Sequence, residues 1–317
     1  MKKPLIVIAG PTACGKTDIS IELAKKIGGE IISGDSMQVY KLMDIGTAKV
    51  TSEEMCGIPH FLVDELYPDE EYNVMLFQKK AKQYMKGIYE RGHIPIIVGG
   101  TGFYINALAY DNDFSEEEEA PIREELYKIA EEKGAEELHR MLSEVDPEYA
   151  AQIHYNNVKR VARALEYYRL TGEKMSEHNK NSKQKQSPYN LAFFVLNMDR
   201  EKLYDRINLR VDIMMKNGLE AEVKSLVNMG YSPELVSMQG LGYKEFMPYF
   251  NGDITLEEAV ENIKKFTRRF AKRQLTWFRG QTNATWIDMG VLSKGKALEI
   301  MINEIIEKEI IEKEIIE

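Results

Sequence analysis

The sequence predicts an α/β fold with a parallel-sheet core, an inserted all-helical domain and a helical C-terminal region. Short apolar runs alternate with helical patterns over residues 1 to about 110, which is typical of a parallel sheet covered by helices. The stretch "GPTACGKT" places Gly10, Gly15, Lys16 and Thr17 at the phosphate-loop spacing, between an apolar run and a helical pattern. From about residue 115 to 190 the pattern is helical before an apolar run returns. The core is therefore expected to be of the P-loop NTPase type.

Three apolar runs in the first third of the chain predict buried strands. They are Leu5–Ala9, Glu30–Ser33 and Ile94–Gly100, and helical patterns occupy Asp18–Ile27 and Val74–Tyr89. In parallel sheets, ligands collect at the carboxyl ends of the strands. The segments that follow these strands are the phosphate loop, "SGDSMQVY" and "GGTGFY", and we expect them to meet in one crevice.

Helical patterns dominate the rest of the chain. "NNVKRVARALEYYRLTG" predicts a helix that Gly172 ends, and the polar stretch "EHNKNSKQKQSPY" predicts an exposed loop. "LAFFVLNM" predicts another strand of the first sheet, so the helices before it form an insertion. Helices are expected over most of residues 200–280, "ATWID" predicts a short strand, and "EIIEKEIIEKEIIE" predicts a charged terminal helix.

These patterns divide the chain into a core, an insertion and a tail. Residues 1–114 and 191–290 are expected to form the α/β core with a basic helical region. Residues 115–190 are expected to form a helical insertion, and residues 291–317 a C-terminal helical tail.

Composition indicates a cytoplasmic protein without a disulfide framework. The chain has 317 residues, 44% of them apolar, and no apolar run is long enough to span a bilayer. Its N-terminus enters the phosphate loop without a signal-peptide pattern, so no membrane partner is expected. The two cysteines, Cys14 and Cys56, have no companion Cys-x-x-Cys pair or His cluster, which argues against a zinc site.

Charge is unevenly distributed along the chain. The formal net charge of −9 argues by itself against a nucleic-acid partner. However, the acidic block "SEEEEAPIREELYKIAEEKGAEEL" contrasts with the basic stretch "KKFTRRFAKRQLTWFRG" near the C-terminus. This basic stretch is either a solvated helix face or a surface for phosphates. Interleaved Phe266, Phe270, Leu275 and Trp277 favour the second, because they give one side a packing role and leave the cations for a partner.

The phosphate loop predicts a polyphosphate ligand. Such loops supply backbone N–H groups at a helix N-terminus, with Lys16 for terminal phosphates and the Thr17 hydroxyl for Mg²⁺. A nucleotide, ATP or GTP, is the default ligand. However, the third strand ends in "IIVGGTG", without the acidic residue that many NTPases use to bind metal. This absence argues against an ATPase.

Three further residues are candidates for catalysis. Asp35 could hold Mg²⁺ through water or accept a proton from a nucleophile, or it could be a turn or capping residue; its position opposite the phosphate loop favours catalysis. Thr101 could contact the phosphates or the acceptor, and could also be a helix N-cap. Arg123 could clamp a leaving phosphate, although a merely exposed arginine is the simpler expectation.

Several motifs together resemble one enzyme family. "GPTACGKT", "ISGDSMQVYKLMDIGTAK", "IPHFLVD", "PIIVGGTGFYINAL", "NNVKRVARALE", "GLEAEV", "QGLGYKE" and "AKRQLTWFR" occur in this order between Pro4 and about Asp288. In order and spacing the chain resembles the tRNA dimethylallyltransferases of the bacterial type, also called tRNA isopentenyltransferases. The second and fourth of these motifs are together far more specific than the phosphate loop.

The resemblance implies transfer of a dimethylallyl group from dimethylallyl diphosphate to N6 of the adenosine immediately 3′ of the anticodon. It implies a monomer that binds dimethylallyl diphosphate, Mg²⁺ and the tRNA anticodon stem-loop and releases diphosphate. Asp35, Thr101, Arg123 and Lys16 would be catalytic, with Asp35 accepting the proton of the attacking amine. The diphosphate site would comprise Gly10, Pro11, Thr12, Ala13, Cys14, Gly15, Lys16 and Thr17, with Thr17 also facing the metal.

The resemblance further implies that the helical insertion, residues 115–190, grips tRNA. It also implies three tRNA-binding segments and a basic helix, Lys264–Arg279, that contacts the phosphate backbone of tRNA, so that affinity for tRNA falls steeply with salt. The adenine must be unstacked to react. Cys14 stands where the family usually has serine, and Lys159 where some members have glutamine, so Lys159 suits a phosphate better than a base edge. The segments comprise Asp35, Ser36, Met37 and Gln38; Lys159, Arg160, Val161, Ala162 and Arg163; and Gln239, Gly240, Leu241, Gly242, Tyr243 and Lys244.

Two alternatives use the same residues differently. A P-loop kinase of a small metabolite or nucleoside would explain the phosphate loop and Asp35, but leaves "KRVAR", "QGLGYK" and the basic helix without a role. A tRNA-binding module that holds nucleotide only structurally would explain the RNA surfaces without a reaction. The products formed from dimethylallyl diphosphate, ATP and tRNA distinguish the three.

Overall fold

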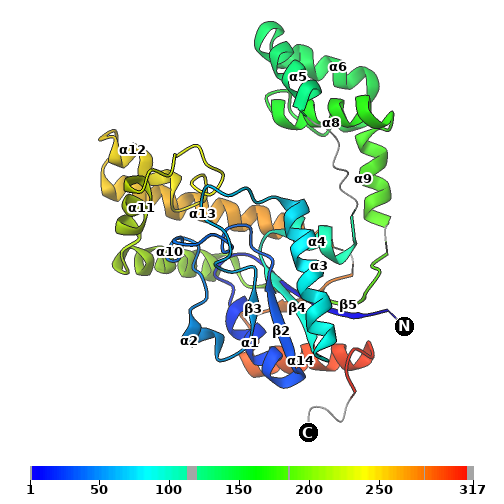
Figure 1. Cartoon of the computed structure of the whole chain (residues 1–317), viewed down its shortest axis with the longest axis vertical. Helices are drawn as coiled ribbons and strands as arrows, with labels where there is room; N and C mark the ends of the chain where they lie inside the picture. The colour runs from blue at the N-terminus through cyan, green and yellow to red at the C-terminus, as the bar shows by residue number, and fades with distance from the viewer. Residues whose placement is uncertain (1, 113–119, 185, 282, 313–317) are drawn as a thin grey trace. The chain divides into compact units, whose positions relative to one another are not determined.

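The computed structural model describes residues 2–112, 120–184, 186–281 and 283–312, and it divides into two compact units (Figure 1). Unit 1 comprises Met1–Asp111 and Ser187–Glu317, and unit 2 comprises Asn112–Gln186. The first boundary thus lies three residues, and the second four residues, before those placed from the sequence, and the C-terminal region belongs to unit 1.

Unit 1 is built on a parallel sheet in which the strands have the order β3-β2-β4-β1-β5-β6. The strands are β1 (Pro4–Ala9), β2 (Gly29–Ser33), β3 (His60–Phe61), β4 (Ile94–Gly99), β5 (Asn190–Asn197) and β6 (Thr285–Asp288). All neighbouring strands in this order pair in parallel. The predicted α/β fold with a parallel sheet is confirmed. Strand β3 was not predicted, because two residues carry no periodic signal.

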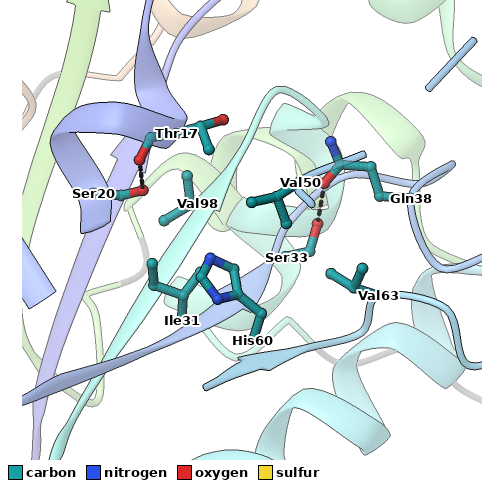
Figure 2. A pocket seen from close by; sticks show the side chains of 9 residues that line it. All are labelled: Thr17, Ser20, Ile31, Ser33, Gln38, Val50, His60, Val63 and Val98. Carbon is teal, nitrogen blue, oxygen red and sulfur yellow. Dashed lines mark hydrogen bonds between the residues drawn. The ribbon is translucent and has the colours of Figure 1, made fainter. Parts of the chain in front are cut away.

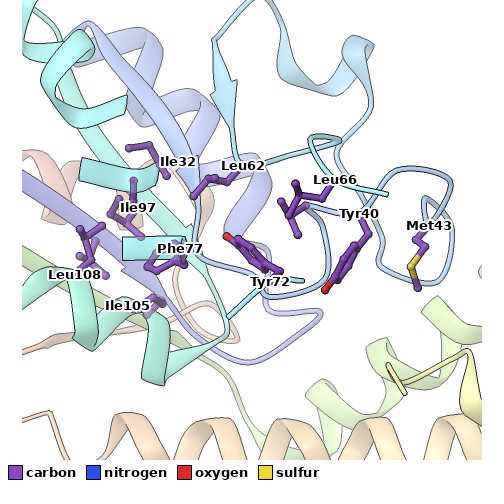
Figure 3. Packing of buried hydrophobic residues seen from close by; sticks show 14 of the residues in the cluster. Ile32, Tyr40, Met43, Leu62, Leu66, Tyr72, Phe77, Ile97, Ile105 and Leu108 are labelled. Carbon is purple, nitrogen blue, oxygen red and sulfur yellow. The ribbon is translucent and has the colours of Figure 1, made fainter. Parts of the chain in front are cut away.

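Helices cover both faces of this sheet, so the side chains of the central strand β1 are buried in alternate directions. Leu5 and Val7 join a cluster with α3 (Val74–Glu90) and α4 (Gly102–Ala109), part of which Figure 3 shows. Ile6 and Ile8 join a second cluster with α1 (Lys16–Ile27) and α14 (Lys294–Glu307). A strand buried on both faces reads as a continuous apolar run, as observed.

The remaining helices of unit 1 follow β2 and β5 in the chain. They are α2 (Ser52–Met55), α10 (Arg200–Lys216), α11 (Leu219–Asn228), the 3₁₀ helix η1 (Lys244–Phe246), α12 (Met247–Phe250) and α13 (Leu256–Phe278). Helix α13 begins with a capping box, in which Thr255 and Glu258 each accept a hydrogen bond from the other's backbone N–H. In the part of the chain that the structure describes, no helix is both long and apolar enough to cross a membrane.

The packing face of α13 differs from the one predicted. Ala259, Ile263, Ala271, Gln274 and Phe278 are buried. By contrast, Trp277 is 43% exposed, and Phe266 and Phe270 are only half-buried. Phe266, Phe270 and Trp277, which were expected to pack, therefore lie partly on the surface, next to the cations that were expected to bind a partner.

Unit 2 is a helical unit with its own core, around Leu138, Leu142 and Val161. Gly172 ends α8 in a left-handed conformation with φ 75°, as predicted. The polar stretch after it was predicted to be a loop, but most of it is helix α9, whose Ser176 N–H donates to Asp146 Oδ2 at 2.8 Å. This tertiary bond has no local sequence signal. The helices are α5 (Ala120–Lys133), α6 (Ala135–Val145), α7 (Pro147–Ala150), α8 (Val158–Thr171) and α9 (Met175–Gln184).

The terminal repeat does not continue as one helix. Helix α14 ends at Glu307, and Glu309 has a left-handed backbone with φ 53°. Ile310 and Ile311 then turn back into the second apolar cluster, where they are at least 91% buried. The predicted charged helix is therefore wrong from residue 308 to 312, because burial of these isoleucines outweighs helix continuation. Residues 313–317, and residues 115–119 of the acidic block, lie outside the described residues.

Candidate functional site

The loops that follow β1, β2 and β4 meet at one edge of the sheet, because these strands are neighbours. The Gly34 N–H donates to the Val98 carbonyl at 2.8 Å, and the Thr101 N–H donates to the Gly34 carbonyl at 3.2 Å. A Cβ on Gly99 would lie 2.3 Å from the Gly34 backbone, so only glycine permits this approach. The structure thus brings together the three segments that the sequence assigned to one crevice.

The phosphate loop encircles the N-terminus of α1. Gly10 has φ 150°, and a Cβ there would lie 2.6 Å from the Leu196 carbonyl oxygen. The Lys16 ammonium donates to the carbonyls of Pro11 at 2.7 Å and Gly10 at 3.1 Å. The Cys14 side chain is 1% exposed and packs in the second cluster. The N-terminus of α1, its backbone N–H groups and Lys16 form a site suited to anions.

Gln274 on α13 ties this loop to the segment after β4. Its Oε1 accepts from the Thr12 N–H at 3.0 Å, and its Nε2 donates to the Gly100 carbonyl at 3.0 Å. The side chain is buried, so these two bonds are shielded from water. Sequence reasoning missed Gln274, because it is 262 residues from Thr12 and its motif was assigned only to RNA contact.

Two arginines of α10 add positive charge to the phosphate loop. Arg206 donates through Nε to the Ala13 carbonyl at 2.8 Å, and Arg210 donates through Nη1 to the Thr12 hydroxyl at 3.2 Å. Burial lowers the pKa of Arg210, but a guanidinium remains protonated at any physiological pH. Both residues were missed in the sequence. The two arginines are four residues apart and so lie on one face of a helix, a pattern that could have indicated a shared ligand.

Asp35 lies in a turn at the end of β2. Its Oδ1 accepts from the Met37 N–H at 2.8 Å, so the turn role considered for it is present. Thr101 occupies the N-cap position of α4 but makes no capping bond with its side chain. Instead, its hydroxyl oxygen accepts from the Ser36 N–H at 3.1 Å. Thr101 therefore holds the Asp35 turn beside the segment after β4.

Neutral aromatic side chains surround the Asp35 turn. Burial raises the pKa of Tyr104 to about 12, with smaller effects from Tyr40 and Asp35. Burial likewise raises the pKa of Tyr72 well above its usual range, and the Tyr104, Glu65 and Asp35 side chains add to the effect. Tyr72 packs edge-on against both Tyr40 and Tyr104. These phenols therefore stay protonated at neutral pH and surround the Asp35 turn with neutral side chains.

A small cavity lies behind Thr17, between α1 and the ends of β2 and β4 (Figure 2). Its volume is about 30 Å³, enough for one water, whereas ligand pockets usually measure about 300–1,000 Å³. Gln38 lines it and accepts from the Ser33 hydroxyl at 3.1 Å, while its Nε2 donates to the Thr47 and Ala48 carbonyls at 3.4 and 3.3 Å. The Gln38 side chain is thus engaged within the protein rather than presented to RNA.

Burial divides the predicted tRNA segments into surface and core residues. In α8, Lys159, Arg160 and Arg163 are exposed. The Val161 and Ala162 side chains are fully buried in the unit 2 core. In the third segment, Gln239 and Lys244 are exposed, whereas Gly242 and Tyr243 are buried. The contacts available to a partner are therefore mainly cationic or amide side chains. The binding of tRNA by these segments stays a prediction.

Helix α13 presents a row of exposed cations. Those exposed are Lys265, Arg269, Lys272, Arg273 and Arg279. Two other cations of the basic stretch bind α10: Lys264 pairs with Asp212 at 2.8 Å, and Arg268 donates to Asn208. The exposed row has the charge expected for a nucleic-acid backbone surface.

Arg123 lies on α5 of unit 2, where its guanidinium donates to Glu166 through Nη2 at 2.7 Å and Nε at 3.1 Å. Glu166 is 3% exposed, so this bond is largely shielded. Arg123 is therefore neither simply exposed nor part of unit 1, and its predicted contact with the reacting groups stays a prediction.

The described residues contain no group of three or more His, Cys, Asp or Glu side chains arranged to hold a metal. At the phosphate loop, Thr17 at the start of α1 offers a hydroxyl to a divalent ion. Mg²⁺ suits such a site, because it usually keeps several waters and binds substrate phosphates alongside few protein groups.

Comparisons with known proteins point to one family. The sequence model of the IPP transferase family matches residues 38–281. A tRNA dimethylallyltransferase from Lachnoclostridium phytofermentans is 55% identical over 286 residues, covering 90% of this chain and 91% of that one. Another, from Carboxydothermus hydrogenoformans, is 52% identical and covers 96% of this chain and 98% of that one.

Solved structures agree with the sequence relatives. The full-length tRNA isopentenylpyrophosphate transferase of Bacillus halodurans is 46% identical, with a TM-score of 0.75 and 97% of each chain covered. A eukaryotic dimethylallyltransferase acting on tRNA is 32% identical, with a TM-score of 0.83, covering 97% of this chain and 80% of that one. The similarity thus extends through both units.

Proposed function

This chain belongs to the IPP transferase family, and we propose that it transfers the dimethylallyl group of dimethylallyl diphosphate to N6 of the adenosine immediately 3′ of the anticodon in tRNA. Like its relatives, it is a transferase that modifies tRNA. The kinase alternative finds no support among those relatives. One observation carries the proposal. In this family member the phosphate loop, the Asp35 turn and the Thr101 hydroxyl lie together at one edge of the sheet.

The phosphate loop would bind the diphosphate. As the allylic C–O bond breaks, negative charge grows on the departing diphosphate, and fixed cations lower the free energy of that state. Lys16, Arg206 and Arg210 are the cations at this loop. Their attachment to loop oxygens supports this role, because groups already held in place need little reorganisation during the reaction.

Asp35 would act as the general base. N6 of the adenine attacks the allylic carbon, a C–N bond forms, the C–O bond breaks, and the amine proton passes to the Asp35 carboxylate. One carboxylate oxygen, Oδ1, already accepts the Met37 N–H, which leaves Oδ2 for the proton. A neutral aryl amine is a weak nucleophile, so placement beside the allylic carbon supplies much of the acceleration. Thr101 would fix this placement through its bond to Ser36.

Mg²⁺ is the expected cofactor, and the site fits it. Thr17 and the diphosphate oxygens would hold the ion, with water completing its shell. When bound, it would supply positive charge that stabilises the leaving diphosphate. The exposed cations of α8 and α13 would bind the anticodon stem-loop, while Arg123 would act on the reacting groups only if its bond to Glu166 is exchanged for one to substrate.

The function is tested by giving the purified protein labelled dimethylallyl diphosphate, labelled ATP and unmodified tRNA. Label from the prenyl donor appearing in tRNA, at the adenosine 3′ of the anticodon, supports the proposal. Phosphate transferred from ATP to a small acceptor would instead identify a kinase, and tight tRNA binding without either product would identify a binding module. The control is tRNA that carries guanosine at the target position, which lacks the adenine amine.

Arg210→Met is expected to raise the dissociation constant of dimethylallyl diphosphate about tenfold or more, because it removes a partly buried cation next to Thr12. Affinity for tRNA should change by less than about twofold, since the residue lies on the phosphate side. Equilibrium titration with each substrate measures both. Arg200→Met is the matched control, because Arg200 starts the same helix but is exposed and lies over Tyr204. Equal diphosphate affinity in the two variants would contradict the assignment.

A further inference from the structure

The Glu222 carboxylate collects four hydrogen bonds from two separate segments of unit 1. Its Oε2 accepts from the N–H groups of Asp44 at 2.9 Å and Ile45 at 2.7 Å. Its Oε1 accepts from the Gly46 N–H at 3.0 Å and from the Tyr243 hydroxyl at 2.7 Å. Glu222 lies near the start of α11, where a helix favours negative charge. Because both carboxylate oxygens accept hydrogen bonds, Glu222 fixes the backbone of residues 44–46 relative to the Tyr243 hydroxyl.

The first of these segments, residues 44–46, lies in the loop that follows the Asp35 turn in the chain. Leu42 and Ala48 have left-handed backbones, with φ 67° and 48°, although neither is glycine. Such conformations persist only where surrounding contacts hold them. Lys49 provides one set of contacts, donating to the Tyr40 carbonyl at 2.7 Å and pairing with Asp44 and Asp64. Glu222 provides the other set of contacts, because it binds residues 44–46, which lie between Leu42 and Ala48.

The second segment is Gln239–Lys244, and it packs directly against the first. A Cβ on Gly46 would lie 2.5 Å from the Tyr243 ring, so the ring occupies the space of a side chain. A Cβ on Gly240 would lie 2.5 Å from Cε of Met37, the residue whose N–H binds Asp35. Burial and the Glu222 charge keep the Tyr243 pKa well above its usual range, so its hydroxyl remains a donor. Tyr40 and Met43 anchor the same loop in the first apolar cluster (Figure 3).

We propose that Glu222 is a positioning residue for the tRNA side of the reaction, an inference that rests on the proposed function. Its carboxylate locks residues 44–46 to Tyr243, and through Gly240 and Met37 this contact reaches the Asp35 turn. The phosphate loop lies outside this set of bonds and is held by Lys16 and Gln274 instead. Loss of Glu222 should therefore impair the use of tRNA while leaving diphosphate binding intact.

The test is Glu222→Gln, assayed with each substrate varied in turn. Glutamine has one acceptor oxygen and presents an NH₂ group to donors, so at least two of the four bonds are lost. We expect kcat/KM for tRNA to fall about 10- to 100-fold, and the dissociation constant of dimethylallyl diphosphate to change less than about twofold. Amide hydrogen exchange at residues 44–46 should become faster. Glu220→Gln is the matched control, because Glu220 lies on the same helix and accepts only from the Tyr249 hydroxyl among the bonds described.

Two results would overturn the proposal: kcat/KM for tRNA in Glu222→Gln equal to that of Glu220→Gln, or a parallel loss of affinity for both substrates, which would indicate general disruption. Should Glu222→Gln fail to fold, Tyr243→Phe removes a single donor and is assayed in the same way. If the unaltered enzyme transfers no label to tRNA, the proposed function itself fails. An active parent enzyme with an equally active Glu222→Gln variant refutes only the positioning role.

Discussion

Asp35→Asn is expected to lower the rate of prenyl transfer by about 10²- to 10⁴-fold, the usual contribution of a positioned general base. Asparagine retains Oδ1, which accepts the Met37 N–H in the present turn, so the loop should keep its conformation. The amide cannot take the proton of the attacking N6. Affinity for tRNA should therefore remain near that of the parent enzyme. Single-turnover transfer with saturating tRNA, together with equilibrium tRNA binding, measures the two effects separately.

The control for this variant is Asp205→Asn, which makes the same chemical change at an exposed position of α10. It should transfer the prenyl group at the parental rate. Near-parental transfer by Asp35→Asn would show that another group, or water, takes the proton, and Asp35 would then be only a turn residue. A large loss of tRNA affinity in Asp35→Asn would instead indicate a binding role.

The sequence predicted the fold where patterns are local. Apolar runs bounded by glycine predicted β1, β2 and β4, and the phosphate-loop spacing predicted the turn between β1 and α1. The resemblance to tRNA dimethylallyltransferases predicted the family and the transferase activity, and the comparisons confirm both. Helix α9 was not predicted, because its polar composition resembles a loop. Its docking depends on Asp146, which lies 30 residues away in the chain.

The site was predictable only as far as its motifs extend. Lys16, Asp35 and Thr101 stand in recognisable motifs, and the sheet order places them at one edge. Arg206 and Gln274 are 193 and 262 residues from their partners in the phosphate loop, so no local pattern connects them. The burial of individual side chains could not be predicted from the motifs either. Tyr243 stands in a segment assigned to tRNA, but its side chain lies wholly inside the protein.

Lys16→Ala is expected to lower kcat/KM for dimethylallyl diphosphate by about 10²- to 10³-fold, the range observed when a group that stabilises developing charge is removed. Both diphosphate binding and transfer should suffer, because the ammonium attracts the bound diphosphate and stabilises it more as it leaves. Affinity for tRNA should be unchanged. Titration with dimethylallyl diphosphate, followed by single-turnover transfer at saturating donor, separates the two losses.

The removal of Lys16 also removes its bonds to the Gly10 and Pro11 carbonyls, so a loosened loop is the competing explanation for any loss. Gln274 still holds Thr12 in this variant, and the thermal unfolding temperature should therefore remain within a few degrees of the parent. Lys25→Ala, on the exposed end of the same helix, controls for loss of one positive charge. Diphosphate affinity equal to that of Lys25→Ala would exclude Lys16 from the phosphate site. A loss of affinity at unchanged thermal stability would assign that loss to the missing charge.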